Sequence, residues 1–232
     1  MSHATLHYIH DPLCGWCYGA APLVKAAREV LPVRAHGGGM MAGARRQSVT
    51  EALRGYVLPH DRRIAELSGQ PFGEAYADGL LRDTTAVFDS EPPIAAMLAA
   101  KAIDGSDLDL LARLQTAHYV EGRRIADRSV LEELAVSVGL EREAFAAALR
   151  VAEGAPVHSH IAQTRALMQR LGVQGFPSFA LEIDGQWRVL DAGRFMGQPA
   201  DFAEHLRQRL PAPPTPSPAA GDTCGLESCE RS

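Results

Sequence analysis

Residues 11–19 read DPLCGWCYG, and the fold is best approached from this stretch. Cys14 and Cys17 have a spacing that occurs in metal sites, in structural disulfides and in redox centres, so the pair alone does not separate these uses. Before the pair, residues 4–10 (ATLHYIH) alternate their side chains between two faces, which predicts a strand. After it, residues 17–31 carry apolar side chains at helical spacing. The first cysteine is therefore expected where a strand gives way to a helix.

That position favours redox chemistry over a metal site. A helix begins with unpaired backbone N–H groups and a partial positive charge, and both stabilise a thiolate. We therefore expect Cys14 to be the exposed, attacking thiol. Cys17 lies one helical turn further on, is expected to be more buried, and can resolve a mixed disulfide by attacking the sulfur of Cys14. Trp16 adds an apolar edge that a protein or peptide substrate could contact.

The rest of the chain predicts a helical segment between two groups of strands. Residues 32–39 indicate a second strand, and Pro22 is expected to kink the helix before it. Ser129 with Glu132 fits a capping box. Near the end, residues 178–192 form a strand pair around the turn signal Asp184-Gly185. Further helices are expected at residues 48–58, 92–103, 107–120, 129–139, 141–152, 156–171 and 199–210.

Phe176 and Pro177 stand immediately before that strand pair. Only about 5–6% of X–Pro bonds in folded proteins are cis, so the proline alone says little. A cis-proline loop beside the cysteines would leave the backbone of Phe176 free to pair with an extended substrate. The alternative is a proline at a strand start, where no ladder donor is needed.

With these motifs in view, the chain resembles the DsbA family of thioredoxin-fold proteins, and within it the FrnE-like branch and predicted protein-disulfide isomerases, many of them cytoplasmic. The resemblance implies an α/β thioredoxin-like fold from residues 1–40 and 160–210, a helical insertion at 41–159, and a proline-rich tail at 211–232. It implies Cys14 as nucleophile, Cys17 as resolving thiol and Pro177 as the cis-proline. The stretches that carry it are DPLCGWCYG (11–19), FDSEPPIAAMLAA (88–100), EGRRIADRSVLEELAVSVGL (121–140) and GVQGFPSFAL (172–181).

The expected activity is thiol–disulfide exchange with protein or peptide substrates. The two sulfurs suffice for this chemistry, so no cofactor is expected, while glutathione and thioredoxin are candidate electron partners. The dipeptide Gly15-Trp16 replaces the Pro-His of oxidising DsbA proteins. Without that histidine a less oxidising potential is expected, and the choice between reduction, oxidation and isomerisation stays open.

Two alternatives remain at this point. The same fold occurs in glutathione transferases of the kappa type and in 2-hydroxychromene-2-carboxylate isomerases, which generally have a serine where Cys14 stands and lack the second cysteine. A zinc-binding or sensor module using all four cysteines is the other. The presence of both cysteines argues against the first alternative, and the position of Cys14 between a strand and a helix start argues against zinc, so redox chemistry is preferred and no metal site is predicted.

Cys224 and Cys229 form a second pair, C-x4-C, after a proline-rich linker at residues 211–223. In extended form the linker could reach roughly 40 Å, which is long enough to bring the tail thiols to Cys14. A relay of electrons between the two pairs is therefore a hypothesis. A tail with two incidental thiols is the alternative.

Composition excludes some partners. The chain of 232 residues has a net charge of −5, which gives no reason to expect nucleic acid or an anionic membrane surface. No apolar run approaches the roughly 20 residues that span a bilayer. The N-terminus lacks the basic start and long apolar stretch of a secretory signal, so a cytoplasmic protein is expected.

Several histidines lie near the redox motif in the sequence. His7, His10 and Asp11 are candidates to tune Cys14 or to shuttle its proton, with strand packing and a turn before Pro12 as the alternative explanations. His158 and His160 are two positions apart, and on a helix such side chains point in different directions. A metal shared by this second pair is therefore not expected.

Overall fold

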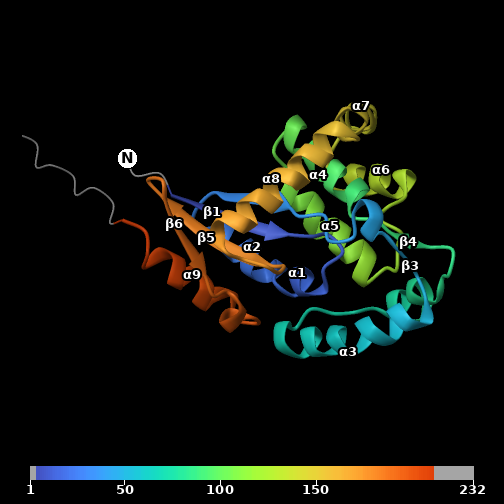
Figure 1. Cartoon of the computed structure of the whole chain (residues 1–232), viewed down its shortest axis with the longest axis horizontal. Coiled ribbons are helices and arrows are strands. Elements are labelled where there is room, and N and C mark those ends of the chain that lie inside the picture. The colour runs from blue at the N-terminus through green and yellow to red at the C-terminus, as the bar shows by residue number, and fades with distance from the viewer. Residues whose placement is uncertain (1–3, 212–232) are drawn as a thin grey trace, which may run out of the picture.

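The computed structural model describes residues 4–211, and a four-stranded sheet with the order β2-β1-β5-β6 lies at its centre (Figure 1). β1 and β2 are parallel, whereas β5 is antiparallel to β1 and to β6. This is the thioredoxin-like arrangement that the sequence predicts. The strands of the sheet are β1 (Ala4–His10), β2 (Val33–Gly37), β5 (Ser178–Ile183) and β6 (Gln186–Leu190).

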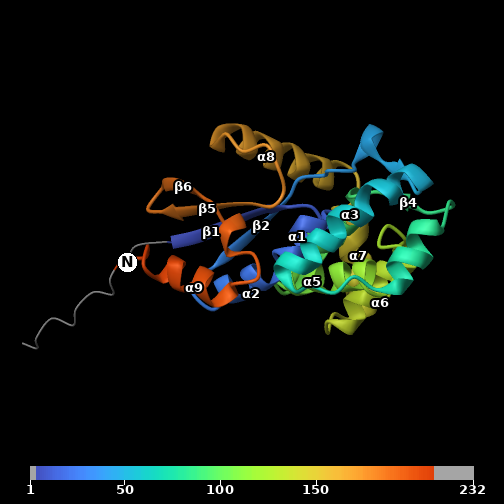
Figure 2. The ribbon, with the colours of Figure 1, turned by 90° about the horizontal axis from the view of Figure 1, so that it is seen from below.

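The central strand β1 is buried on both faces over residues 6–10. One face is covered by α2 (Ala21–Arg28) and α9 (Pro199–Arg207), which pack together, and the other by α8 (Ala155–Leu171) (Figure 2). Because helices cover both faces of the strand, it has no solvent-facing positions at which polar residues would alternate with apolar ones. This coverage explains why the strand contains so few residues that face solvent.

The register of the sheet brings distant parts of the chain together. Ile9 pairs with Ser178, so the end of β1 lies beside the start of β5. The residues that follow β1 contain Cys14, and the residues that precede β5 contain Pro177. The two motifs, far apart in sequence, therefore meet at one end of the sheet.

The helix after the cysteine pair is broken rather than kinked. α1 (Gly15–Gly19) ends at Ala20, and α2 begins at Ala21 with Pro22 in its first turn. A proline is tolerated there because the first N–H groups of a helix have no partner inside it. Pro22 therefore starts a new helix instead of bending a continuous one.

The segment between the strands is mainly helical. Its α-helices are α3 (Glu51–Ser68), α4 (Glu91–Ile103), α5 (Asp107–Tyr119), α6 (Arg128–Ser137) and α7 (Arg142–Ala152), followed by α8. Short elements complete it, at Gly43–Arg45, Ala75–Gly79 and Leu80–Arg82, together with the strand pair β3 (Gln47–Ser48) and β4 (Val87–Phe88). A further single turn, Gly193–Phe195, follows β6.

Two expectations for this segment are wrong. α3 continues through Pro59 to Ser68, whereas the sequence pattern ends it at residue 58. The cost of the lost backbone bond at Pro59 is met by packing, since α3 lies against α1 (Figure 1). Ser129 does not cap α6 either, because the helix starts at Arg128 and Asp127 occupies the cap position.

One hydrophobic core runs through the sheet and the helical segment, and includes Tyr8 and Phe179 as well as Leu110 and Phe145. The division at residues 40 and 160 into a thioredoxin part and an insertion stays a prediction. Within residues 4–211, no helix is both long and apolar enough to cross a membrane. Cys224 and Cys229 lie outside the described residues.

Candidate active site

Cys14 occupies the cap position before α1, as expected. Its backbone is extended there (φ −94°, ψ 112°), and its sulfur accepts a hydrogen bond from the Cys17 N–H at 3.3 Å. The same N–H also reaches the Cys14 carbonyl oxygen at 2.9 Å. A thiolate at this position would thus be met by a backbone donor and by the positive end of a helix turn.

The prediction that Cys14 is exposed is wrong. Only 5% of Cys14 is accessible to solvent, and Cys17 is fully buried. The cause is the loop before β5, because the Cys14 thiol lies 3.5 Å from the carbonyl oxygen of Phe176, to which it donates. A local sequence pattern cannot show a cover that comes from 162 residues away.

Cys17 differs electrostatically from its partner. Burial raises the pKa of the Cys17 thiol well above its ordinary value, and the adjacent Cys14 sulfur raises it further. The strand below supports the helix turn, since the Tyr8 hydroxyl donates to the Cys17 carbonyl oxygen at 3.2 Å. Cys17 is therefore held as a neutral thiol next to the sulfur of Cys14.

The loop before β5 is fixed from two sides. The Phe176–Pro177 peptide is cis. The Phe176 ring fills the space where a side chain at Gly38 would begin, with ring carbons 2.2 Å from that position. The guanidinium of Arg165 lies over the ring, 5.2 Å from its centre. Gly38 thus has a packing role at the end of β2, where the sequence offers only a run of glycines.

Asp11 holds the turn that carries the cysteines. It is completely buried and accepts hydrogen bonds from Leu13 N–H at 3.0 Å, from Met40 N–H at 2.6 Å and from the Ser90 hydroxyl at 2.9 Å. Burial raises the pKa of Asp11, and the two backbone bonds act in the opposite direction. The turn expected before Pro12 is present, and its carboxylate also ties β2 and the start of α4 to it.

Asp61 is a site residue that the sequence did not single out. It comes from α3, is 5% exposed, and accepts a hydrogen bond from the Tyr76 hydroxyl at 3.0 Å. Burial raises its pKa to about 6. A side chain at Gly15 would begin 2.9 Å from the Asp61 carboxylate and 3.1 Å from Ile64, so any larger residue at this position of the motif requires these two side chains to shift. Trp16, next along, is half-buried.

The histidines considered in the sequence make no hydrogen bond to Cys14 or Cys17. His7 contacts Glu182 at 2.8 Å and His36 at 2.9 Å. His10 is completely buried, and within residues 4–211 neither of its ring nitrogens has a partner. In the same described range, no group of three or more His, Cys, Asp or Glu residues could hold a metal ion.

His158 and His160 are separated in the structure. His158 lies 3.1 Å from Glu91, at the surface. The ring of His160 points toward the sheet and accepts a hydrogen bond from the Gly37 N–H at 2.9 Å. The prediction that they share no metal agrees with these different partners.

Comparison with known protein families identifies the family of this chain. Residues 5–207 match the profile of the DSBA-like thioredoxin domain. The chain belongs to this family. Both the profile and the fold therefore indicate a disulfide oxidoreductase of the DSBA-like family. No protein of curated function matches the chain.

Three solved structures are similar to this chain over almost their whole length. The cytosolic disulfide reductase DsbM from Pseudomonas aeruginosa is 60% identical, with a TM-score of 0.84, over 88% of this chain and 97% of that chain. The same protein solved with GSH is 58% identical, with a TM-score of 0.83, over 88% of this chain and 98% of that one. A putative protein disulfide isomerase from Nitrosomonas europaea, at 22% identity and a TM-score of 0.71 over 89% and 99% of the two chains, shares the fold.

Proposed function

We propose that this DSBA-like protein is a cytoplasmic reductase of protein disulfides, with Cys14 as the attacking thiol and Cys17 as the resolving thiol. The observation that carries the proposal is the asymmetry of the pair. Cys14 caps a helix turn and its sulfur accepts the Cys17 N–H, whereas the more deeply buried Cys17 thiol has a raised pKa. The 60% identity to a cytosolic disulfide reductase supports the direction of electron flow and the compartment.

The reaction takes two exchange steps. The Cys14 thiolate attacks one sulfur of a substrate disulfide, so that a mixed disulfide forms and the other substrate sulfur leaves as a thiolate. Cys17 then loses its proton and attacks the Cys14 sulfur. The mixed disulfide breaks, the second substrate thiolate leaves, and Cys14 and Cys17 are joined. The substrate has gained two electrons, and the protein has lost two.

Substrate is proposed to enter along Phe176. The Phe176 carbonyl lies beside the Cys14 sulfur, and an extended peptide bound along this loop would bring its disulfide to that atom. Trp16, half-buried on α1, supplies an apolar contact on the other side of the motif. Because Cys14 is only 5% exposed, the substrate disulfide has to lie in an extended segment rather than in a flat surface.

Glutathione is the proposed electron donor. Two molecules of it return the protein to the dithiol form by the reverse exchange, with release of oxidised glutathione, so the electrons balance. The related DsbM structure with GSH supports a glutathione-type thiol at this fold. The proposed protein substrate is defined by one feature, a disulfide in an extended segment.

Two assays separate reductase from isomerase. In glutathione buffer the protein is expected to accelerate insulin reduction, and the Cys14→Ser variant is expected to lose this acceleration. In the second assay, scrambled ribonuclease should regain activity slowly, because each productive encounter ends in reduction. If the protein restores ribonuclease efficiently and leaves insulin oxidised, the assignment as a reductase is wrong.

The glutathione transferase alternative has its own test. A Cys17→Ser variant keeps one thiol at the helix start, as such enzymes keep one serine. Turnover of a small aromatic electrophile with glutathione by this variant, together with an inactive wild type in the insulin assay, would contradict the proposal. We expect no such turnover.

A further inference from the structure

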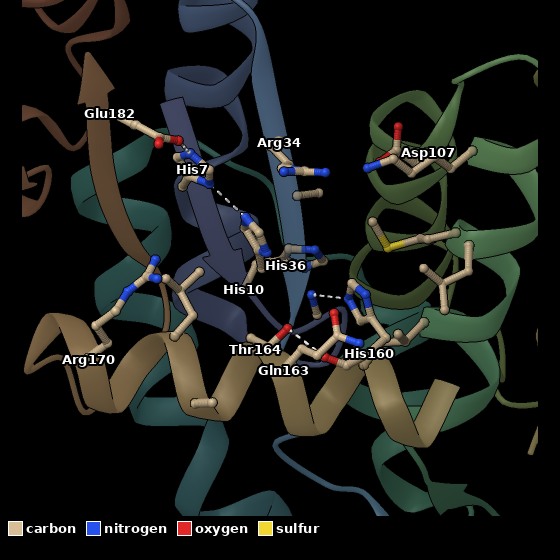
Figure 3. Close-up of a pocket in the computed structure, with 18 of the residues that line it drawn as sticks. His7, His10, Arg34, His36, Asp107, His160, Gln163, Thr164, Arg170 and Glu182 are labelled. Atoms are coloured by element: carbon tan, nitrogen blue, oxygen red, sulfur yellow. Dashed lines mark hydrogen bonds and ion pairs between the residues drawn. The ribbon is translucent and has the colours of Figure 1, made fainter. Parts of the chain in front are cut away.

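A sizeable cavity among residues 4–211 is lined by none of the redox residues. It has a volume of about 720 Å³ and opens between the β1–β2 side of the sheet and helices α8 and α4 (Figure 3). Its lining includes none of Cys14, Cys17, Phe176 or Pro177. Small-molecule sites typically occupy roughly 300–1,000 Å³, so the cavity has the size of a ligand site. The redox reaction proposed above leaves it unused.

The polar side of the cavity is formed by four histidines. Glu182 accepts from His7, and the other nitrogen of His7 contacts His36, which together make a chain of hydrogen bonds along the sheet (Figure 3). His160, from α8, accepts the Gly37 N–H through Nε2, so that its neutral ring carries the proton on Nδ1 and can donate it. The fourth histidine, His10, lines the same cavity.

His10 is the observation that points to a ligand. It is completely buried, and within residues 4–211 neither ring nitrogen has a hydrogen-bond partner. A buried polar group without a partner costs roughly 1–3 kcal/mol, so native structures rarely retain one without a compensating contact. Both nitrogens are closed to solvent, so a molecule in the cavity reaches them only when the ring turns toward it, and it would then supply the missing partner.

The charges around the cavity favour an anion. Arg34, Lys101 and Arg170 line it, against the carboxylates of Asp107 and Glu182, which leaves one net positive charge when the histidines are neutral. Both carboxylates have partners inside the lining, at 2.8 Å from Glu182 to His7 and at 3.8 Å from Asp107 to Lys101. Among the described residues, Arg34 and Arg170 form no salt bridge.

Apolar side chains also line the cavity. Most come from α4 and α8, and an indole from β6 lies beside His7 on the sheet, with the Arg170 guanidinium over it at 4.6 Å. A ligand that fits both kinds of side chain carries a negative group at the histidines and an aromatic or branched body against the apolar surface. The apolar residues are Ile94, Met97, Leu98, Leu167 and Trp187.

We propose that the cavity between α8 and the sheet is a second binding site, distinct from the redox site, for a small organic anion with an apolar body. The anionic group is received by His160 Nδ1, with Arg34 and Arg170 as cations of the same lining and His10 behind it. The negative group of the ligand pairs with these arginines, which have no carboxylate partner of their own in the described part of the chain. The apolar body of the ligand lies on the α4 side chains.

The probe for the test is 8-anilinonaphthalene-1-sulfonate, an aromatic anion that fluoresces when it leaves water. Its neutral counterpart, N-phenyl-1-naphthylamine, has the same rings without the sulfonate. With the full-length protein, we expect saturable binding of one sulfonate probe per chain and at least about tenfold weaker binding of the neutral one. Equal affinity for the two probes would overturn the anion specificity.

Matched variants on α8 locate the probe. Ala166 is exposed and lines the cavity, whereas Ala162, one helical turn earlier, is exposed and does not. Ala166→Trp is expected to fill the entrance and weaken binding of the sulfonate at least about tenfold, with Ala162→Trp unchanged. Both variants should retain insulin reduction, which shows that they fold. Unaltered binding in Ala166→Trp would overturn the proposal.

A charge variant and a block at the redox site complete the test. Arg34→Ala should weaken binding of the sulfonate probe by roughly three- to tenfold and leave binding of the neutral probe unchanged. Arg188→Ala, on β6 outside this lining, should change the binding of neither probe. Alkylation of Cys14 should leave the probe bound. If alkylation displaces it, the probe occupies the redox site and the proposal of a second site fails, independently of the proposed reductase activity.

Discussion

At the scale of single residues, the motif CGWC is shaped by a residue outside it. Gly15 is small because Asp61 and Ile64 of α3 occupy the space that any side chain would enter. The same helix supplies a carboxyl whose burial raises its pKa to about 6. The dipeptide between the cysteines is thus constrained by the helical segment as well as by redox chemistry.

Replacement of Gly15 by alanine tests this constraint. The added methyl group would stand 2.9 Å from the Asp61 carboxylate, so Gly15→Ala is expected to lower the free energy of unfolding by about 1–3 kcal/mol, as other overpacked sites do. Gly55→Ala is the matched control, because Gly55 lies in α3 with nothing within 4 Å, and it is expected to be stabilising by up to about 1 kcal/mol. Urea unfolding of both variants measures the difference. Equal stabilities would contradict the account.

The residue scale also shows what the sequence could predict. The position of Cys14 followed from two local periodicities, an alternating strand before it and a helix after it, and the cap geometry agrees. Its exposure could not be predicted, because the covering Phe176 loop is 162 residues away. Asp61 gave no local signal for the same reason: its contact with Gly15 exists only once α3 packs on α1.

At the scale of elements, strands with strong periodicity were predicted well and interrupted helices poorly. β1 and the β5–β6 pair follow alternation and a turn signal, which are local properties. α3 runs past Pro59 because packing against α1 compensates for a broken backbone bond, and packing is not visible in a window of sequence. The element that matters most for the site is the loop before β5, held between Gly38 and Arg165.

Replacement of Gly38 by alanine should displace that loop. The new methyl group would meet the Phe176 ring at 2.2 Å, so Phe176 must move from Cys14. We expect Gly38→Ala to reduce kcat/KM for insulin by at least about tenfold, because misplacement by 1 Å can cost up to about a hundredfold. Gly175→Ala, in the same loop with nothing within 4 Å, should keep its activity. A fully active Gly38→Ala protein would remove the positioning role of the contact.

At the scale of the whole molecule, the core contains histidines that folding keeps neutral. Burial lowers the pKa of His10, of His36 and of His118 to about 3. Unfolding returns these groups to an ordinary value of about 6.5, so the unfolded chain binds more protons below that pH. Asp61 acts in the opposite direction between about pH 4 and 6, because its raised pKa makes the folded state bind the extra proton.

Stability should therefore fall as the pH is lowered from about 6.5 toward 3. Each buried neutral histidine contributes a slope of about 1.4 kcal/mol per pH unit, and the three histidines together outweigh the opposing Asp61 carboxyl between pH 6 and 5. Urea unfolding at a series of pH values measures it. His118→Phe, which keeps a ring among Tyr76, Phe88 and Tyr119, should reduce the slope by about 1.4 kcal/mol per pH unit. An unchanged slope in this variant would contradict the assignment of His118.

The second cysteine pair, Cys224 and Cys229, lies outside the described residues, and its role stays a hypothesis about the whole chain. A relay between Cys224–Cys229 and Cys14–Cys17 requires that the two pairs exchange electrons. The full-length variant Cys224→Ser/Cys229→Ser is then expected to be reduced by glutathione at a rate at least about threefold different from that of the wild type, since the linker can span roughly 40 Å. The rate is measured as the appearance of a Cys14 thiol that can be alkylated. Identical rates for the two proteins would make the tail thiols incidental.

The central claim is that Cys14 attacks and Cys17 resolves, and trapping of the mixed disulfide tests it most directly. Reduced Cys17→Ser protein is mixed with oxidised insulin or with an extended peptide disulfide, quenched with acid and analysed by mass spectrometry. We expect a stable covalent adduct on Cys14, no adduct with Cys14→Ser at the same time, and only a transient one with the wild type. An adduct that forms on Cys17 in the Cys14→Ser variant as fast as on Cys14 in the Cys17→Ser variant would contradict that claim.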